Sequence, residues 1–162
     1  MALRSDWSAS TCPIARSLDV VGDPWVLLIL REALLGTRRY DQFRSKLGVA
    51  DNVLSRRLQG MVDAGLLRRA PYRARRRTHH EYILTGAGRD LLPVVHALAL
   101  WGEEHTTPPP EGGHLSIVHR SCGQPSTTPD VCSNCGDALR AADVAWRRPW
   151  RSPELTPLAA GD

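Results

Sequence analysis

RYDQFRSKLGVADNVLSRRLQGMVDAG, residues 39–65, is the stretch of sequence that decides the fold. In its first part Tyr40, Phe43 and Leu47 recur at helical spacing, and Gly48 ends the pattern. A second helical pattern begins only a few residues later. Two short helices joined by a tight turn that contains glycine are typical of a helix-turn-helix. The stretch therefore predicts this motif.

The second helix of the motif has an apolar face and a polar face. We expect it to be capped at Asp51 or Asn52 and to end at Gly65. Its apolar face is formed by Leu54, Leu58, Met61 and Val62. The opposite face carries Asn52, Arg56, Gln59 and Asp63, with Ser55 and Arg57 on its flanks. The polar face is the candidate surface for a partner.

A β-hairpin with a cationic tip is expected after the motif. Residues 66–72 and 79–84 have the composition of two strands, and residues 73–78 connect them. Six arginines lie between residues 68 and 77 with no acid among them, and they would repel one another unless a partner neutralised them. A helix-turn-helix followed by a hairpin is the order of a winged helix.

Two helices are expected before the motif. The first begins at Thr11-Cys12-Pro13 and reaches about Val21, where Gly22-Asp23-Pro24 breaks it. The second runs from there to Leu35 and ends at Gly36. It is apolar on most sides, which predicts the central core helix.

One long helix is expected after the hairpin. Thr85 can cap it, and it should run to about Glu104. Between Leu91 and Trp101 its only polar residue is His96. A terminal helix without a polar face needs a partner, and a second subunit is the simplest one.

The fold class that we expect is mainly α (α+β), in four parts. Residues 1–106 form a winged helix-turn-helix with dimerisation helices at both ends, and the proline-rich residues 107–113 form a linker. Residues 114–148 form a small zinc-ribbon-like module, and residues 149–162 a flexible tail. The 162 residues are 42% hydrophobic, which supports a packed core.

The distribution of charge points to nucleic acid. The chain has a net charge of +4, but residues 38–80 hold twelve Arg and Lys against three Asp, a balance of +9, which leaves −5 for the rest. Such asymmetry marks one segment as the contact for a polyanion. No stretch approaches the roughly 20 apolar residues that span a bilayer, and no export signal is apparent, so we expect a cytoplasmic protein that does not bind a membrane.

Double-stranded DNA is the partner that this chemistry suits. The side chains expected on base edges in the major groove are Asn52, Ser55, Arg56 and Gln59. Those expected on phosphates are Arg38, Arg39, Lys46 and Arg57. The hairpin tip would reach the adjacent minor groove or backbone through Arg73, Arg75, Arg76 and Arg77. The alternatives are a solvated charged surface, or a winged helix that binds protein.

A series of motifs in fixed order is similar to the HxlR family of winged-helix transcription regulators. The motifs are Cys12-Pro13-Ile14, Gly22-Asp23-Pro24-Trp25, Leu30-Arg31, Arg39-Tyr40-Asp41-Gln42-Phe43, Asn52-Val53-Leu54-Ser55-Arg56-Arg57-Leu58, Ala64-Gly65-Leu66 and Tyr82-Ile83-Leu84-Thr85-Gly86-Ala87-Gly88. The resemblance covers about residues 12–105. It implies a homodimer, formed by terminal helices, on an inverted repeat in a promoter. The family contains repressors and activators, and we expect a repressor.

Cys12 is the candidate sensor of oxidants or electrophiles. Some members of the family sense such compounds through a cysteine at this position, and a helix N-terminus favours the thiolate. The alternative is a small buried residue in a capping turn. A small-molecule inducer bound near Trp25 and Trp101 is a further possibility that the sequence leaves open.

The last segment carries two knuckles of one form, a ligand pair with two residues between followed by glycine. Their ligands are His119, Cys122, Cys132 and Cys135. Four N and S ligands without an open position predict a structural zinc site. The alternatives are free cysteines, or an oxidation switch in which Cys122 pairs with another cysteine. A zinc-dependent enzyme is disfavoured because a closed site holds no activated water, so we expect no enzyme.

Overall fold

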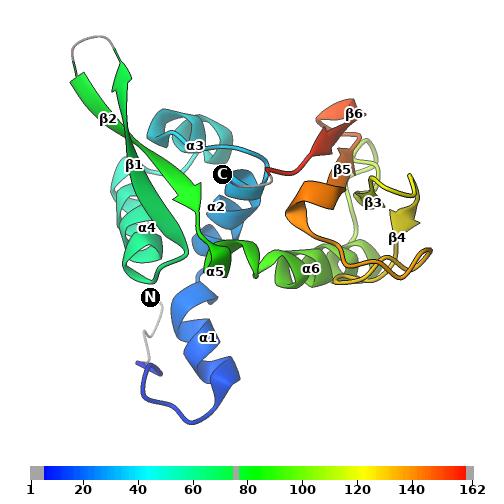
Figure 1. The fold of residues 1–162 in the computed structure, drawn as a ribbon, viewed down its shortest axis with the longest axis horizontal. Coiled ribbons are helices and arrows are strands. Elements are labelled where there is room, and N and C mark those ends of the chain that lie inside the picture. Colours follow the sequence, from blue (N-terminus) through cyan, green and yellow to red (C-terminus); the bar gives the residue numbers. More distant parts are fainter. Residues whose placement is uncertain (1–5, 75–76, 160–162) are drawn as a thin grey trace.

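The computed structural model describes residues 6–74 and 77–159, and for residues 73, 74, 77 and 78 the backbone alone (Figure 1). The first part contains α1 (Pro13–Val21), α2 (Pro24–Leu34), α3 (Tyr40–Leu47), α4 (Asp51–Asp63), β1 (Leu67–Ala74), β2 (Arg77–Leu84), α5 (Gly86–Arg89) and α6 (Leu92–His105). The second contains β3 (Ser116–His119), β4 (Pro125–Ser126), the 3-10 helix η1 (Ala141–Asp143), β5 (Val144–Arg148) and β6 (Ser152–Pro157). Figure 1 shows α6 leading from the helices and the hairpin to a small sheet. The architecture is the winged-helix arrangement that the sequence predicts.

The central helix is α2, as predicted. Asp23 caps it, because its Oδ1 accepts the N–H of Trp25 at 2.9 Å, and Pro24 fills the first position, where no donor is needed. Its fully buried side chains are Ile29, Leu30 and Leu34. The helices α1, α3, α4 and α6 and the strand β2 all contact it. The core of the first part is therefore built around this helix.

The helix α1 contacts α2 only near the end where Val21 packs on the core. It has no buried residue, and its apolar side chains Ile14 and Leu18 are 70% and 48% exposed. Figure 1 shows it below the other helices, joined to α2 through the break at Gly22. Its apolar face thus lacks a partner within the part of the chain that the structure describes. No helix among the described residues is long and apolar enough to cross a membrane.

The helix-turn-helix consists of α3 and α4. Gly48 ends α3 in the left-handed conformation, with φ of +62°, which glycine adopts without strain. The predicted cap of α4 at Asp51 or Asn52 is wrong, because Ala50 is the N-cap and Asp51 lies in the first turn. The Asp51 carboxylate instead pairs with Arg44 Nε at 3.2 Å, and so ties the start of α4 to α3.

The hairpin is longer than predicted. Its strands pair in antiparallel register from Leu67 opposite Leu84 to Ala74 opposite Arg77. Backbone pairing therefore extends into residues 73–78, which we expected to be a loop. The arginine-rich sequence does not prevent it, because the hydrogen bonds between strands join backbone groups. The base of the hairpin is also fixed to the residue pair before α3, where the N–H of Tyr82 donates to the carbonyl of Arg38 at 2.7 Å.

The single helix predicted after the hairpin is broken in two. Thr85 caps α5 as expected, with its Oγ1 accepting the N–H of Gly88 at 3.2 Å. A new helix, α6, begins at Leu92, because Pro93 has no N–H and its ring would clash with the carbonyl four residues earlier. A Cβ at Gly88 would collide with the carbonyl oxygen of Leu66, so α5 packs directly on the chain before β1.

The second part of the chain is built on a sheet in the order β4-β3-β5-β6. The tail that we expected to be flexible belongs to this sheet, since Thr156 of β6 lies opposite Trp146 of β5. Beyond β6 the side chain of Leu158 is buried, and the N–H of Ala159 donates to the carbonyl of Leu34 at 2.7 Å. The prediction failed because the acceptor is one of the unpaired carbonyls at the end of α2, far away in the sequence.

His96 of α6 joins the two parts of the molecule and is fully buried. Its Nε2 accepts the indole N–H of Trp146 at 3.0 Å, so its Nδ1 carries the proton and donates to the carbonyl of Pro129 at 2.8 Å. Burial lowers the pKa of His96, although the bond to Pro129 opposes the effect. Only the neutral imidazole satisfies both contacts.

We expect acid to destabilise the protein through His96. The unfolded chain binds a proton near pH 6.5 while the folded chain resists it, so the free energy of unfolding should fall as the pH drops below about 6.5. Urea unfolding of the wild type and of His96→Gln at about pH 7 and about pH 5.5 checks this. Glutamine keeps a donor and an acceptor but does not titrate. Equal losses of stability in the two proteins would contradict the assignment.

Candidate nucleic-acid interface and metal cluster

The exposed face of α4 carries Asn52, Ser55 and Arg56. Within the described chain, neither the amide of Asn52 nor the guanidinium of Arg56 has a hydrogen-bond or ion-pair partner. Ser55 is oriented by Tyr40, whose hydroxyl lies 3.1 Å from Ser55 Oγ and donates to the carbonyl of Asp51 at 3.0 Å. This face therefore presents the amide, hydroxyl and guanidinium groups that read base edges. From the sequence, Tyr40 was assigned only to the helical pattern and to a family motif.

Gln59 is held within the protein. Its amide group donates to Asp63 Oδ1 at 2.7 Å, and its Oε1 accepts from Arg69 Nη2 at 2.6 Å. Arg69 comes from β1 and also lies over Tyr82, 5.8 Å from the ring centroid. Gln59 thus fastens α4 to the hairpin. Its predicted contact with a base would require these bonds to be exchanged, and it stays a prediction.

Arg57 points toward α2 rather than outward with Arg56. Its Nη2 lies 2.5 Å from Oδ2 of Asp23, and both side chains are about one third exposed, at 27% and 30%. The same carboxylate caps α2 through its other oxygen. Arg57 therefore fixes α4 against the junction of α1 and α2. Its predicted phosphate contact is not supported by this orientation.

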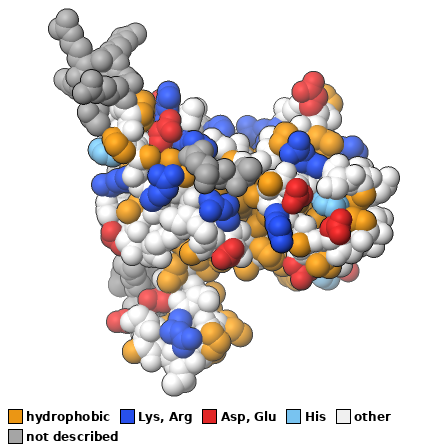
Figure 2. Space-filling view, viewed as in Figure 1, with side chains coloured by type: hydrophobic (Ala, Val, Ile, Leu, Met, Phe, Trp, Pro, Cys, Tyr) orange, Lys and Arg blue, Asp and Glu red, His pale blue; other side chains and the backbone are white. Residues whose placement is uncertain are grey.

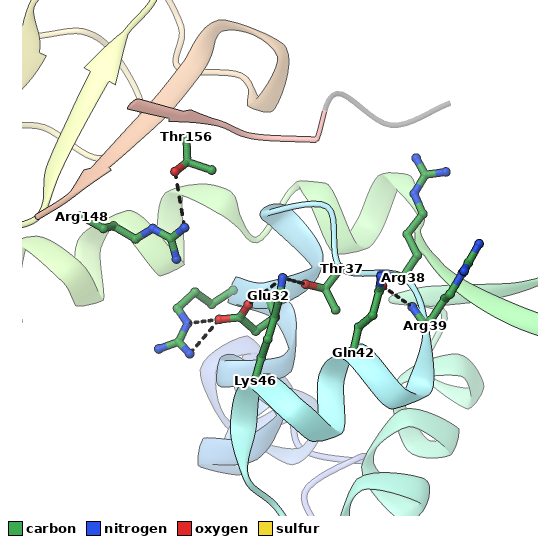
Figure 3. A network of polar contacts seen from close by, with 9 residues as sticks. Glu32, Thr37, Arg38, Arg39, Gln42, Lys46, Arg148 and Thr156 are labelled. Carbon is green, nitrogen blue, oxygen red and sulfur yellow. Dashed lines mark hydrogen bonds and ion pairs between the residues drawn. The ribbon is translucent and has the colours of Figure 1, made fainter. Parts of the chain in front are cut away.

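Arg38 and Arg39 lie at the start of α3. In Figure 3 their side chains point away from the polar network around Glu32. Arg39 Nε donates to Glu81 Oε1 at 3.1 Å, and its guanidinium lies 4.5 Å from the centroid of the Tyr72 ring. The hydrogen bond to Glu81 raises the pKa of Arg39. Arg39 is thus positioned beside the hairpin.

Lys46, expected on a phosphate, reaches back to α2 instead (Figure 3). Its Nζ donates to Thr37 Oγ1 at 2.7 Å and lies 3.7 Å from Oε2 of Glu32. Glu32 is only 5% exposed and also accepts from Arg31 Nη2 at 2.9 Å. A buried carboxylate needs such partners. Lys46 therefore stabilises the charge of Glu32 within the fold. The sequence pattern concealed Glu32 because it lies within an otherwise apolar helix.

The cationic tip of the hairpin is only partly described. Arg75 and Arg76 lie outside the described residues, as do the side chains of Arg73 and Arg77. Below the tip, Figure 2 shows Lys and Arg side chains over the base of the hairpin and the helices beside it. The minor-groove role of the four tip arginines stays a prediction.

Cys12 is the N-cap residue of α1 and is exposed in the single chain. Trp25 and Trp101 do not line a common cavity, since Trp25 packs on the core and Trp101 is 60% exposed. A cleft of about 180 Å³ instead lies between α6 and the second sheet. Its lining includes Leu98, Glu103, Leu115 and Trp150.

The four predicted metal ligands meet in one cluster. Their ligand atoms all lie within 4.8 Å of one another, on residues His119, Cys122, Cys132 and Cys135. The Sγ atoms of Cys122 and Cys132 are 3.7 Å apart, and Nδ1 of His119 lies 3.5 Å from Cys122 Sγ and 3.2 Å from Cys135 Sγ. Bonds of about 2.3 Å to sulfur and about 2.0 Å to nitrogen give edges of about 3.5 to 3.8 Å in a tetrahedron. The cluster could therefore hold a metal ion.

Backbone donors prepare one thiol of the cluster for metal binding. The N–H groups of Asn134 and Cys135 lower the pKa of Cys132 to about 6, so that its thiolate is present at neutral pH. The N–H of Asp137 acts in the same direction on Cys135, but burial and the neighbouring thiols outweigh it and raise the pKa of Cys135 to about 11. Gly136, at φ of +79°, allows the backbone turn that directs these donors.

A helix-turn-helix that exposes base-reading side chains, followed by a paired hairpin, defines a winged helix-turn-helix DNA-binding protein. The model of the HxlR-like helix-turn-helix family matches residues 20–109. An uncharacterised HTH-type transcriptional regulator of Mycobacterium bovis is 41% identical over 131 residues, 81% of this chain and 82% of the relative. The chain belongs to the HxlR-like helix-turn-helix family and is a DNA-binding transcriptional regulator.

Solved structures agree with this assignment. The crystal structure of PA1607, a candidate transcription factor, matches with a TM-score of 0.69 and 39% identity over 85% of this chain and 94% of the other. The oxidised form of the redox regulator HypR matches with a TM-score of 0.54 and 28% identity over 60% of this chain and all of the other. An alignment of 131 residues is longer than residues 1–109 can supply, so the mycobacterial relative shares part of the second sheet region as well.

We expect the ion pair between Asp23 and Arg57 to stabilise the fold without reading DNA. Asp23→Asn keeps the cap of α2 but removes the charge, and Arg57→Met removes the partner. Each should lower the free energy of unfolding, with a coupling of about 1 kcal/mol in a double-mutant cycle. Urea unfolding measures the cycle, and Arg56→Met is the matched control, expected within about 0.5 kcal/mol of the wild type. Additive effects of the two changes would refute the pairing.

Proposed function

We propose that this protein is a sequence-specific repressor that binds an inverted repeat in a promoter as a homodimer. The observation that carries the proposal is the face of α4 with Asn52, Ser55 and Arg56, which is exposed and chemically suited to base edges. Arg56 would bind guanine and Asn52 adenine. Tyr40 supports the proposed contact with base edges, because it orients Ser55.

The charge of the same unit supports DNA over protein as the partner. Residues 38–80 have a balance of +9, and the hairpin arginines have no acid among them. Phosphate contacts of this kind release counterions, so the affinity should fall with salt. A protein-binding winged helix is the alternative, and it would lack the dependence on DNA sequence.

The homodimer is supported by two apolar faces that the single chain leaves exposed. On α1 and α6 they include Ile14, Leu18, Val20, Val94, Leu98 and Trp101. Apolar patches of this extent mark contact surfaces. A twofold dimer presents two α4 helices in opposite directions, which suits an inverted repeat.

The regulatory signal that we propose is an oxidant or electrophile acting on Cys12. This thiol is exposed at the N-terminus of α1, in the helix with the apolar face. One structural neighbour is a redox regulator by name. A small ligand in the cleft between α6 and the second sheet is the alternative.

The His-Cys₃ cluster is proposed as a structural zinc site. The ligand set and the distances between the ligand atoms suit tetrahedral Zn²⁺. A bound ion would link the two ligand pairs of the second part of the chain. Four protein ligands leave no position for an activated water, and the family consists of regulators, so we propose no enzymatic activity. The metal would add folding free energy to a module with a small core.

We expect Arg56→Ala to lower affinity for the native operator and to relax its sequence preference. Fluorescence anisotropy with the upstream intergenic DNA and a scrambled duplex, at low and moderate salt, measures both effects. The loss should be about 1 to 3 kcal/mol on the operator and smaller on the scrambled duplex. Arg140→Ala, an exposed arginine of the second part, is the matched control. Binding unchanged by Arg56→Ala would remove α4 as the reading helix.

We expect the purified protein to contain one zinc ion per chain. Elemental analysis checks this, with Cys132→Ser expected to lose the metal because it removes the most buried thiol ligand. Cys12→Ser, a cysteine outside the cluster, should retain the full content. A wild type without zinc, or a Cys132→Ser protein with undiminished zinc, would reject the site.

A further inference from the structure

We propose that Cys135 is a site of oxidative modification, through which a peroxide releases the metal and undocks the second sheet region from α6. The inference rests on the proposed zinc site and on the proposed binding of DNA as a dimer. It assigns the protein a second thiol response, separate from Cys12 at the start of α1.

The cluster is accessible at one ligand. Cys132 and His119 are each 1% exposed and Cys122 is partly buried, whereas Cys135 is exposed. An oxidant in solution therefore meets Cys135 before the other thiols. Two further sulfur atoms lie within 4.8 Å of Cys135 Sγ, close enough to react with an oxidised sulfur after small movements.

The reaction balances with a peroxide as the oxidant. As a ligand of the proposed site, Cys135 would be held as a thiolate. Its sulfur attacks one peroxide oxygen, which breaks the O–O bond and yields a sulfenic acid and hydroxide. The thiolate of Cys122 or Cys132 then attacks the oxidised sulfur, a disulfide forms, and a second hydroxide leaves. Two protons from solvent convert both to water. The metal keeps only His119 and one thiolate, and a two-ligand site does not retain it.

The structure connects the cluster to α6 through the segment 126–132. Its end is fixed by Cys132, and its middle by a hydrogen bond from the N–H of Leu139 to the carbonyl of Asp130 at 2.8 Å. The next residue toward β4, Pro129, supplies the carbonyl that accepts from His96 at 2.8 Å. Whichever thiol forms the disulfide, loss of the metal removes the ligand bond that anchors Cys132 at the end of this segment, and this change acts on the acceptor of His96.

Loss of that acceptor affects the proposed dimer helix. His96 is fully buried, so an unsatisfied Nδ1–H is unfavourable and α6 should separate from the module. Away from the module α6 carries Val94 and Trp101, which are 43% and 60% exposed, and Leu98, which is 49% exposed, lies at the edge of the cleft. Movement of α6 changes how these side chains meet a second subunit, and the spacing of the two α4 helices changes with it.

The experiment uses the full-length, zinc-loaded Cys12→Ser protein, so that any response comes from the cluster. Hydrogen peroxide is added, released zinc is followed with a colorimetric chelator, the disulfide is mapped by mass spectrometry, and operator affinity is measured by anisotropy. We expect zinc release, a disulfide from Cys135, and a loss of affinity of roughly tenfold. A thiol reductant with added zinc should restore the affinity.

A second measurement isolates the exposed thiol without a change in the metal cluster. Dimedone traps a sulfenic acid, and we expect it to label Cys135 before the other cysteines, since Cys135 is the exposed ligand.

The outcomes separate the claims. Protein purified without zinc rejects the metal site, and unoxidised protein that ignores the operator rejects the DNA-binding proposal. Zinc that stays bound in peroxide, or dimedone on another cysteine first, overturns Cys135 as the reactive site. Zinc release with operator affinity changed less than twofold overturns the coupling through α6.

Discussion

The rest of the structure depends on α2, a helix that is buried on most sides and must still satisfy its polar groups. Its first N–H groups are met by Asp23, and the carbonyl of Leu34 near its end is met by the N–H of Ala159, from the far end of the chain. Its one buried acid, Glu32, accepts from Arg31 and lies near Lys46 (Figure 3). Residues beside α2 and a segment near the C-terminus thus bind to one helix through its unpaired backbone and carboxylate groups.

Local patterns of spacing and composition predicted the helix-turn-helix, the hairpin and the central helix, because the residues that define each element are close together in the sequence. The ligand pairs of the metal cluster were predicted for the same reason, since the bite of each knuckle is fixed by two intervening residues. The features that escaped prediction join distant positions. No periodic pattern in the sequence marks the contact between Asp23 and Arg57, or the one between Leu34 and Ala159. Pro93 could have predicted the break before α6, because its clash with the preceding turn outweighs the apolar pattern.

The net charge of a segment overstates the number of its side chains that can contact DNA. Arg56 and Arg57 are neighbours in the sequence, but successive residues of a helix point about 100° apart, so one is exposed and the other pairs with Asp23. Lys46 forms an ion pair with Glu32, and Arg39 forms one with Glu81. These cations still contribute to the long-range field that attracts a polyanion, since Coulomb attraction does not require contact. Contacts that read sequence depend on the few side chains without an internal partner.

The joint at His96 ties α6 to two separate segments of the second sheet region. Its donor partner, Trp146, lies on β5, whereas its acceptor partner, Pro129, lies in the segment that leads to Cys132. Both contacts form only when these two segments hold their places together, so a partly folded module would leave a buried imidazole with one unsatisfied nitrogen. The match to the family model ends at residue 109, so the module lies outside the part of the chain that defines the family, whereas α6 lies within it. Through His96, a helix of the family fold is thus tied to a separate, cysteine-bearing unit.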